Sequence, residues 1–169
     1  ALLSTAVHMP LSVDAQGHQH LRAYADAISS LNSGSTGTDI RQNPGISVKL
    51  SALHPRYEVA EKEAMLPIMA ERLLGLCIAA RHARMGLNID AEEADRLDLS
   101  LDVIEAVSGD PSLKGWDGLG LAIQAYQKRC LPLVDWLADL ARRPRRRLMV
   151  RLVKGAYWDS EIKVSQERG

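Results

Sequence analysis

The sequence has no net charge, little cysteine and no long hydrophobic run. Its 169 residues carry 21 Lys and Arg against 21 Asp and Glu, so the formal net charge is zero with neutral histidine. Dedicated nucleic-acid-binding proteins are normally basic, and we therefore expect no nucleic-acid contact. No stretch approaches the roughly 18 uncharged apolar residues that span a bilayer. The start of the chain, residues 1–7, is too short for a signal peptide and has no basic segment.

Cysteine is nearly absent. Cys77 and Cys130 lie in separate apolar segments, and neither belongs to a Cys-x-x-Cys motif. This usage favours reduced, buried thiols in a cytoplasmic protein over a disulfide. No strand is followed by Gly-x-Gly-x-x-Gly, because Gly118-Leu119-Gly120 stands where a strand begins. A dinucleotide-binding Rossmann turn is therefore not expected.

Hydrophobic spacing alternates between the helix period and the strand period. After Ser12, which suits a helix N-cap, the spacing predicts a helix ending at Leu31, and a small polar loop that we expect to be mobile covers residues 32–37. The expected strands cover residues 45–50, 87–90, 118–124 and 147–153. The expected helices cover residues 58–84, 95–107, 131–141 and 160–167, and Pro67 predicts a kink or a restart in the first of these.

This alternation indicates βαβ units and a parallel sheet. The predicted fold class is α/β, a (βα)8 TIM-type barrel that is incomplete, with about four βα units. A complete barrel needs about 250 residues, and this chain has 169. We expect residues 1–44 to form an N-terminal helix and a mobile loop that lead into the barrel. Residues 45–169 would then form the partial barrel.

A polar or charged residue stands at the end of each expected strand. They are Lys49, Asp90, Gln124, and Arg151 with Lys154. In βα barrels the active site lies at the carboxyl ends of the strands, so these side chains predict a ligand site there. The alternative is a ring of paired charges that only stabilises the barrel rim. Three cations suit an anionic partner such as a phosphate, a carboxylate or an electron-rich reduced flavin.

Three further patterns leave alternatives open. The acidic run 90–95 is either a divalent-metal site or, as we prefer, a strand-end Asp90 followed by acids of the next helix's first turn. His8, His18 and His20 are interpreted as solvated surface residues rather than metal ligands. The basic run 142–147 is interpreted as a solvated turn at the opposite barrel end.

Four contiguous segments resemble the proline dehydrogenase domain of the bacterial bifunctional proline utilization A flavoenzymes. The matching segments cover residues 45–57, 88–97, 124–130 and 147–163. The resemblance implies a distorted (βα)8 barrel that binds FAD at the carboxyl ends of its strands. The family's first barrel strand and its last three strands are not recognised in this sequence, so we expect a fragment that is inactive alone.

The resemblance also implies roles for individual residues. Arg151, Lys49 and Asp90 would be catalytic, and Lys49 and Tyr157 would bind the substrate through its carboxylate and its ring. The residues implied to contact FAD are Asp90, Ala91, Gln124, Arg151, Val153, Lys154, Gly155, Ala156 and Trp158. No metal is implied.

The implied reaction is oxidation of L-proline to Δ1-pyrroline-5-carboxylate, with hydride transfer to flavin N5. The electrons would pass to membrane quinone. Association with further copies of the same protein, as a homo-oligomer, is also expected. The expected location is the cytoplasm, with a peripheral place at the inner membrane as the alternative. A different reading is a non-catalytic half-barrel that serves as an interaction or dimerisation module.

Overall fold

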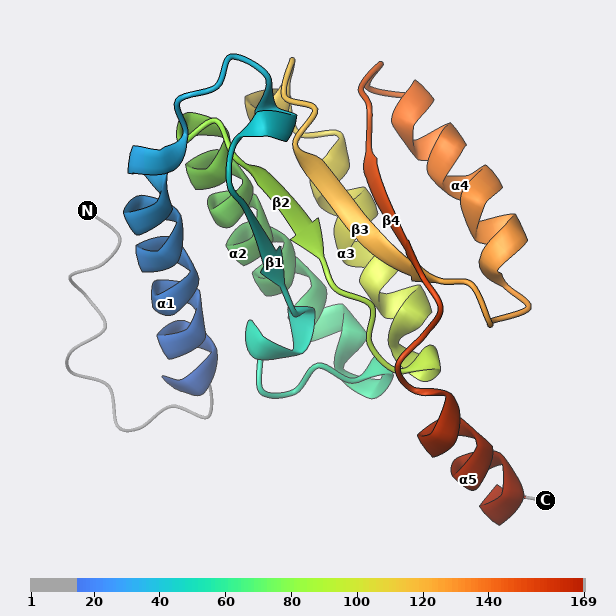
Figure 1. The fold of residues 1–169 in the computed structure, drawn as a ribbon. Helices are drawn as coiled ribbons and strands as arrows, with labels where there is room; N and C mark the ends of the chain where they lie inside the picture. The colour runs from blue at the N-terminus through green and yellow to red at the C-terminus, as the bar shows by residue number, and fades with distance from the viewer. Residues whose placement is uncertain (1–14, 169) are drawn as a thin grey trace.

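Four parallel strands form the frame of the molecule. The computed structural model describes residues 15–168, which contain β1 (Gly45–Val48), β2 (Gly86–Ile89), β3 (Leu119–Gln124) and β4 (Met149–Val153). The strands form one sheet in the order β1-β2-β3-β4, and every neighbouring pair is parallel (Figure 1). The predicted α/β class is confirmed, and a partial βα barrel fits this arrangement.

Helices cover one face of the sheet. In Figure 1, α2 and α3 lie behind the strands, α1 and α4 flank them, and α5 extends beyond the lower edge. The bounds are Ala15–Leu31 for α1, Lys62–His82 for α2, Leu97–Ser108 for α3, Cys130–Arg142 for α4 and Trp158–Arg168 for α5. The other face of the sheet, toward the viewer in Figure 1, is left open by the described helices.

Helix α2 differs from its prediction in its start and in its continuity. A 3-10 turn, Val59–Glu61, precedes it, so the α-helix begins later than expected. Pro67 lies inside one continuous helix, and the predicted restart is therefore wrong. Because Pro67 stands in the second turn, its missing N–H removes only one hydrogen bond, the one that would reach the carbonyl of Glu63.

The hydrophobic core lies between the sheet and the helices α2 and α3. The strand side chains that enter it alternate with residues of the open face, because successive side chains of a strand point to opposite faces. Core members with at most 3% exposure include Val48, Leu87, Ile89, Leu121, Ile123, Leu73, Leu76, Val103 and Ile104. Their burial provides most of the free energy that holds the helices on the sheet.

The open face of the sheet is curled. The strand register pairs Ser47 with Asn88, Asn88 with Gly120, and Gly120 with Met149. Three strand spacings in a flat sheet span roughly 14 Å, yet Arg151 on β4 donates a 3.3 Å hydrogen bond to Ser47 on β1. A side chain makes this contact only when β1 and β4 bend toward each other, as strands of a barrel do.

Helix α1 is fixed to the segment that follows β1. The His20 ring nitrogen Nδ1 lies 3.0 Å from the Ala52 carbonyl oxygen, and His18 Nε2 lies 3.2 Å from Arg72 Nη2. The prediction of surface histidines holds for His18, which is exposed, whereas His20 is half-buried. Both rings also contact protein groups that are distant in the sequence. Ser12 and His8 lie outside the described residues.

The remaining loops and cysteines are tied into the fold. Ser35, in the small polar loop, is only 2% exposed, and its carbonyl accepts a hydrogen bond from Arg84. Cys77 is buried and Cys130 is half-buried, both without a disulfide, and burial raises the pKa of the Cys77 thiol to about 12. No helix within residues 15–168 has the length and apolar character that a membrane span requires.

The basic run 142–147 joins the end of α4 to β4. Arg142 pairs with Asp139 and Arg143 pairs with Glu105, while the Arg147 backbone N–H donates to Asp117 over 3.0 Å. This segment precedes β4, so it lies at the edge of the sheet opposite the carboxyl ends of the strands. This location is as predicted, and the paired carboxylates of Asp139 and Glu105 offset part of the positive charge of the segment.

Replacing Leu87 with alanine is expected to destabilise the fold by about 2–5 kcal/mol, because the removed atoms leave a cavity between β2 and the helices. Leu87 is fully buried, whereas Leu131 is 79% exposed. Urea unfolding followed by circular dichroism measures the change, and Leu131→Ala serves as the control, with an expected change within about 0.5 kcal/mol. Equal effects of the two variants would contradict this placement of the core.

Candidate functional site

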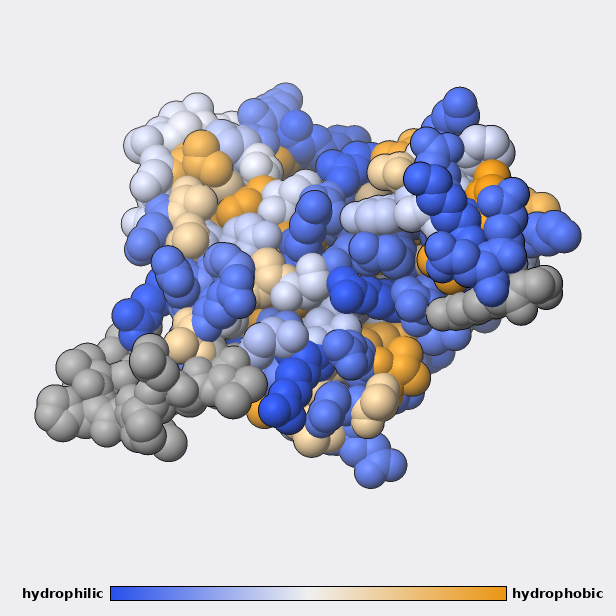
Figure 2. All heavy atoms as spheres, turned by 90° about the horizontal axis from the view of Figure 1, so that it is seen from below, coloured by the Kyte–Doolittle hydropathy of each residue, from blue (hydrophilic) through white to orange (hydrophobic). Residues whose placement is uncertain are grey.

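The carboxyl ends of the four strands bring the predicted site residues to one edge. Lys49 and Asp90 directly follow β1 and β2, Gln124 ends β3, and Arg151 lies within β4. Because the strands are parallel, these positions share the lower edge of Figure 1. Figure 2 shows this edge from below as a mostly hydrophilic surface with scattered apolar patches.

An ion pair crosses the sheet at this edge. The register pairs Ala122 with Arg151 and Leu121 with Ile89, so that Asp90, the next residue, continues the row of Ala122 and Arg151. The Arg151 guanidinium, on β4, pairs with the Asp90 carboxylate beyond β2. Ala122, between them on β3, has only a methyl group, and this small side chain leaves room for the guanidinium to pass.

The pair is partly open to solvent. The Arg151 side chain is 50% exposed and the Asp90 side chain is 23% exposed. Ion pairs with such exposure contribute about 0.2–1 kcal/mol to stability. The fold therefore does not depend on this pair, and the arginine's charge is available to a bound anion or an electron-rich ring.

Gln124 is held by both ends of its amide. The residue is 6% exposed, its Nε2 donates to the Glu92 carbonyl over 2.9 Å, and its Oε1 accepts from the Ala156 N–H over 3.3 Å. These two bonds set the orientation of the amide. Gln124 thus links the loop after β2 to the turn after β4.

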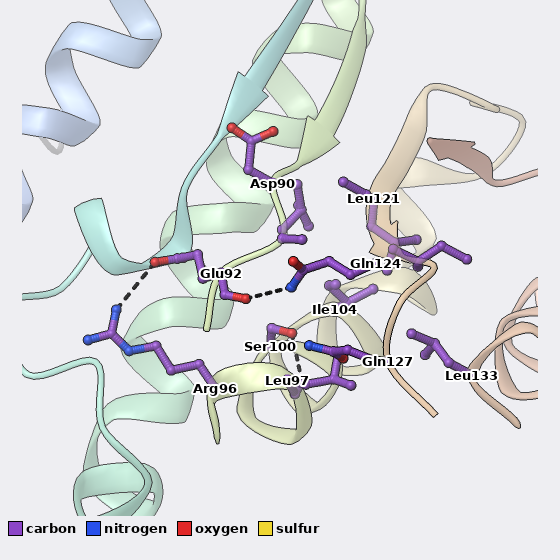
Figure 3. A pocket seen from close by; sticks show the side chains of 14 residues that line it. Asp90, Glu92, Arg96, Leu97, Ser100, Ile104, Leu121, Gln124, Gln127 and Leu133 are labelled. Carbon is purple, nitrogen blue, oxygen red and sulfur yellow. Dashed lines mark hydrogen bonds and ion pairs between the residues drawn. The ribbon is translucent and has the colours of Figure 1, made fainter. Parts of the chain in front are cut away.

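A small cavity lies between the sheet and α3. Its volume is about 20 Å³, near that needed for one water molecule. Asp90 and Gln124 are among its lining residues, while Lys49 and Arg151 are not. In Figure 3 the Gln124 amide points toward Glu92, and the Asp90 carboxylate points away from it. The four strand-end residues share an edge, and two of them, Asp90 and Gln124, line this cavity.

Glu92 stands at the junction of two loops. Its Oε1 accepts from the Ser51 N–H over 3.0 Å, and its Oε2 lies 3.3 Å from Arg96 Nη1. Its side chain is only 8% exposed. The expectation that Glu92 belongs to a helix's first turn is wrong, because α3 begins at Leu97, after the 3-10 turn Ala94–Arg96. Within the described residues, no group of three or more metal-ligating side chains gathers.

The turn after β4 has a backbone that requires glycine. Gly155 has φ +131°, and a Cβ at this position would lie 2.0 Å from Cδ1 of Tyr126. On either side of it Lys154 and Ala156 are exposed, while Val153 is half-buried. This turn thus places the Lys154 cation and the small Ala156 side chain at the edge formed by the carboxyl ends of the strands.

Two aromatic residues continue from this turn. Tyr157 is half-buried, and burial is the main cause of its raised pKa, followed by the Glu93 charge, which Lys49 opposes. Trp158, the first residue of α5, is 56% exposed. A planar ligand could stack on it.

Lys49 and Ala91 complete the predicted set. Lys49 is exposed, and its backbone N–H donates over 3.2 Å to the Tyr24 hydroxyl of α1. Ala91 is half-buried beside Asp90 and lines the small cavity. The N-terminal helix thus fixes the backbone from which the Lys49 side chain extends.

Sequence reasoning missed several residues that organise this edge. They are Ser47, Glu92, Tyr126 and Glu161. Strand alternation could have identified Ser47, two residues before Lys49 on the same face. Glu92, Tyr126 and Glu161 carry no comparable signal, because their partners are distant in sequence.

Comparisons with known proteins agree with this architecture. The family model described as "Proline dehydrogenase" matches residues 7–169. The bifunctional protein PutA of Salmonella typhimurium is 53% identical over 158 residues, which are 94% of this chain and 12% of that protein. The PutA of Escherichia coli is 52% identical, with the same coverage of both chains.

Solved structures give the same result. A structure of Bradyrhizobium japonicum proline utilization A matches with a TM-score of 0.90 and 52% identity, over 93% of this chain and 16% of that one. Proline utilization A from Bdellovibrio bacteriovorus has a TM-score of 0.83 at 24% identity, over 93% of this chain and 18% of its own, which shows a shared fold alone. This chain thus spans a small part of the proteins it matches.

Gly155→Ala is expected to destabilise the protein by about 1–3 kcal/mol, because an L-residue is strained at this positive φ and its Cβ would collide with Tyr126. Thermal unfolding measures the loss. Gly109→Ala is the matched control, since open space surrounds Gly109 and its φ is −85°. A Gly155 variant as stable as this control would contradict the described turn.

Proposed function

This chain belongs to the proline dehydrogenase family, and we propose that it forms part of a site for the FAD-dependent oxidation of L-proline to Δ1-pyrroline-5-carboxylate. The observation that carries this proposal is the curled open face of the sheet, where Arg151 reaches from β4 to Asp90 and Ser47. Because the chain spans 12% of the length of its PutA relative from Salmonella typhimurium, the activity of a whole protein remains part of the proposal.

The residues at the strand ends fit FAD. Lys49, Arg151 and Lys154 are exposed cations at one edge, which suits a pyrophosphate and an anionic reduced flavin. The missing Cβ of Gly155 makes room for the Tyr126 ring beneath the turn, and the exposed Trp158 indole offers a surface for a planar ring. We propose that Val153, Lys154, Gly155, Ala156 and Trp158, with Asp90, Ala91, Gln124 and Arg151, hold the cofactor.

The proposed roles in catalysis follow from charge and position. Lys49 would bind the proline carboxylate, and Tyr157 would contact the proline ring. FAD supplies the hydride acceptor, and the protein contributes orientation and electrostatics. Holding the substrate carboxylate at Lys49 presents the ring carbon next to nitrogen in one orientation, which is a positional advantage.

Arg151 and Asp90 would act as an electrostatic unit. A cation beside the flavin ring favours the negative charge of the reduced form. The Asp90 carboxylate orients the guanidinium and also offsets part of its charge. Arg151 should therefore raise the midpoint potential of a bound flavin, and the negative charge of Asp90 should lower it.

The electron acceptor and the location belong to the same proposal. We propose that the electrons pass to membrane quinone from a cytoplasmic protein, with peripheral attachment to the inner membrane as the alternative. The division of the chain at residue 44, between an N-terminal helix with its loop and the barrel segment, stays a prediction.

A second candidate function is a non-catalytic interaction or dimerisation module. It is favoured by large apolar side chains that are exposed on α4 and β4. They are Leu131, Val134, Val150 and Leu152. Flavin absorbance that elutes with the protein would support the flavoenzyme, whereas colourless dimers would support the module.

Arg151→Met in a full-length protein that contains this chain is expected to lower the flavin midpoint potential and to slow flavin reduction by proline. The variant removes the cation and leaves the Asp90 carboxylate uncompensated. A redox titration measures the potential, and Asp90→Asn is the opposite-sign control, with an expected increase. An unchanged potential in Arg151→Met would remove Arg151 from its proposed role.

The 169-residue chain alone is expected to bind FAD weakly and to show no proline-dependent dye reduction. Its described strands provide four positions on the rim, about half of the eight in a complete barrel. The assay uses purified chain with added FAD, proline and an artificial electron acceptor, and a full-length PutA serves as the positive control. Robust turnover by the chain alone would contradict this expectation.

A further inference from the structure

Helix α5 is attached to two other loops through a single carboxylate. Oε1 of Glu161 accepts a 2.9 Å hydrogen bond from the Ala94 N–H, in the loop after β2. Oε2 of Glu161 accepts a hydrogen bond from the hydroxyl of Tyr126, in the loop after β3. Glu161 lies in the first turn of α5, so these two bonds hold the start of the helix against the loops after β2 and β3.

Tyr126 in turn holds the segment between β4 and α5. Its ring occupies the space that a Cβ of Gly155 would need. Its backbone N–H donates to the Lys154 carbonyl over 3.2 Å, and the preceding Ala125 N–H donates to the Val153 carbonyl over 2.8 Å. The Tyr126 ring therefore packs against Gly155 in this segment, and two backbone hydrogen bonds hold the start of the segment at Val153 and Lys154.

The hydroxyl of Tyr126 is the necessary donor of the contact with Glu161. An ionised carboxylate only accepts hydrogen bonds, so the phenol must keep its proton. Burial and the neighbouring Glu161 raise the pKa of Tyr126 above its ordinary value. The phenol therefore remains a donor throughout the neutral pH range, and the contact persists there.

We infer that Tyr126 and Glu161 are positioning residues that fix the turn 154–157 in the shape that the proposed FAD site requires. The inference rests on the proposed function, because this turn carries much of the proposed cofactor contact surface. Neither side chain is assigned a contact with FAD or proline. Both act through the backbone of the turn, Tyr126 by packing and Glu161 by anchoring Tyr126 and α5.

The test uses Tyr126→Phe and Glu161→Ala in a full-length PutA-type protein that contains this chain. Tyr126→Phe keeps the ring and removes the hydroxyl, and Glu161→Ala removes both acceptors. Each variant is expected to weaken FAD binding about tenfold, the effect of a lost hydrogen bond to a charged group, and to change the visible spectrum of bound flavin. The double variant should be no worse than Glu161→Ala, because the two residues act on the turn as one unit.

Two control variants separate positioning from general stability. Glu161→Gln should recover most of the affinity, since its amide accepts from Ala94 and donates to the phenol oxygen. Asp159→Asn removes an exposed carboxylate from the same first turn of α5 and should leave binding unchanged. FAD affinities of Tyr126→Phe and Glu161→Ala within twofold of Asp159→Asn would overturn the inference, as would additive losses in the double variant.

Hydrogen exchange of the protein without FAD gives a readout that does not depend on cofactor binding. Backbone amides of residues 154–157 should exchange at least severalfold faster in Tyr126→Phe than in the wild type, with core strands unchanged. If the wild type fails to bind FAD, the proposed function is wrong, and faster exchange still supports the positioning role. Global unfolding of Tyr126→Phe, or unchanged exchange at the turn, would overturn that role.

Discussion

Parallel pairing of four short strands is the constraint on which the rest of the structure depends. With all strands in one direction, every strand end that carries a polar residue reaches the same edge. Burial of one sheet face against α2 and α3 leaves the other face open, and the curl of the sheet turns that face into a concave surface. The contact between Arg151 and Ser47 is possible only because of this curl.

Two kinds of polar interaction occupy that edge, and they have different tasks. The Arg151–Asp90 pair is exposed, contributes little to stability and can respond to a ligand. The contacts of Glu92, Gln124 and Glu161 are more enclosed and join successive loops to one another. A site of this form combines a rigid support with a reactive surface, which is what a cofactor needs when the protein supplies mainly orientation and charge.

The sequence predicted the strands and helices within a few residues, because hydrophobic periodicity and glycine or proline breaks are local signals. It missed the 3-10 turns before α2 and α3, and it placed Glu92 in the wrong element. It also placed His20 in solvent, although His20 is half-buried and contacts the Ala52 carbonyl. The errors at Glu92 and His20 share a cause, since each side chain contacts a partner many residues away. The two 3-10 turns are closed by local hydrogen bonds.

The sequence alone determined the order of elements, the parallel sheet and the residues at the strand ends, since these follow from period and spacing. Its long matching segments also indicated the family. Only the tertiary structure decided which strand-end groups interact: Arg151 meets Asp90 across Ala122, while Gln124 turns to Glu92 and Ala156. Such pairings depend on the curl of the sheet and on the small side chain of Ala122 between the two charged residues. The hydrophobic pattern of a single strand does not reveal how that strand lies relative to the others.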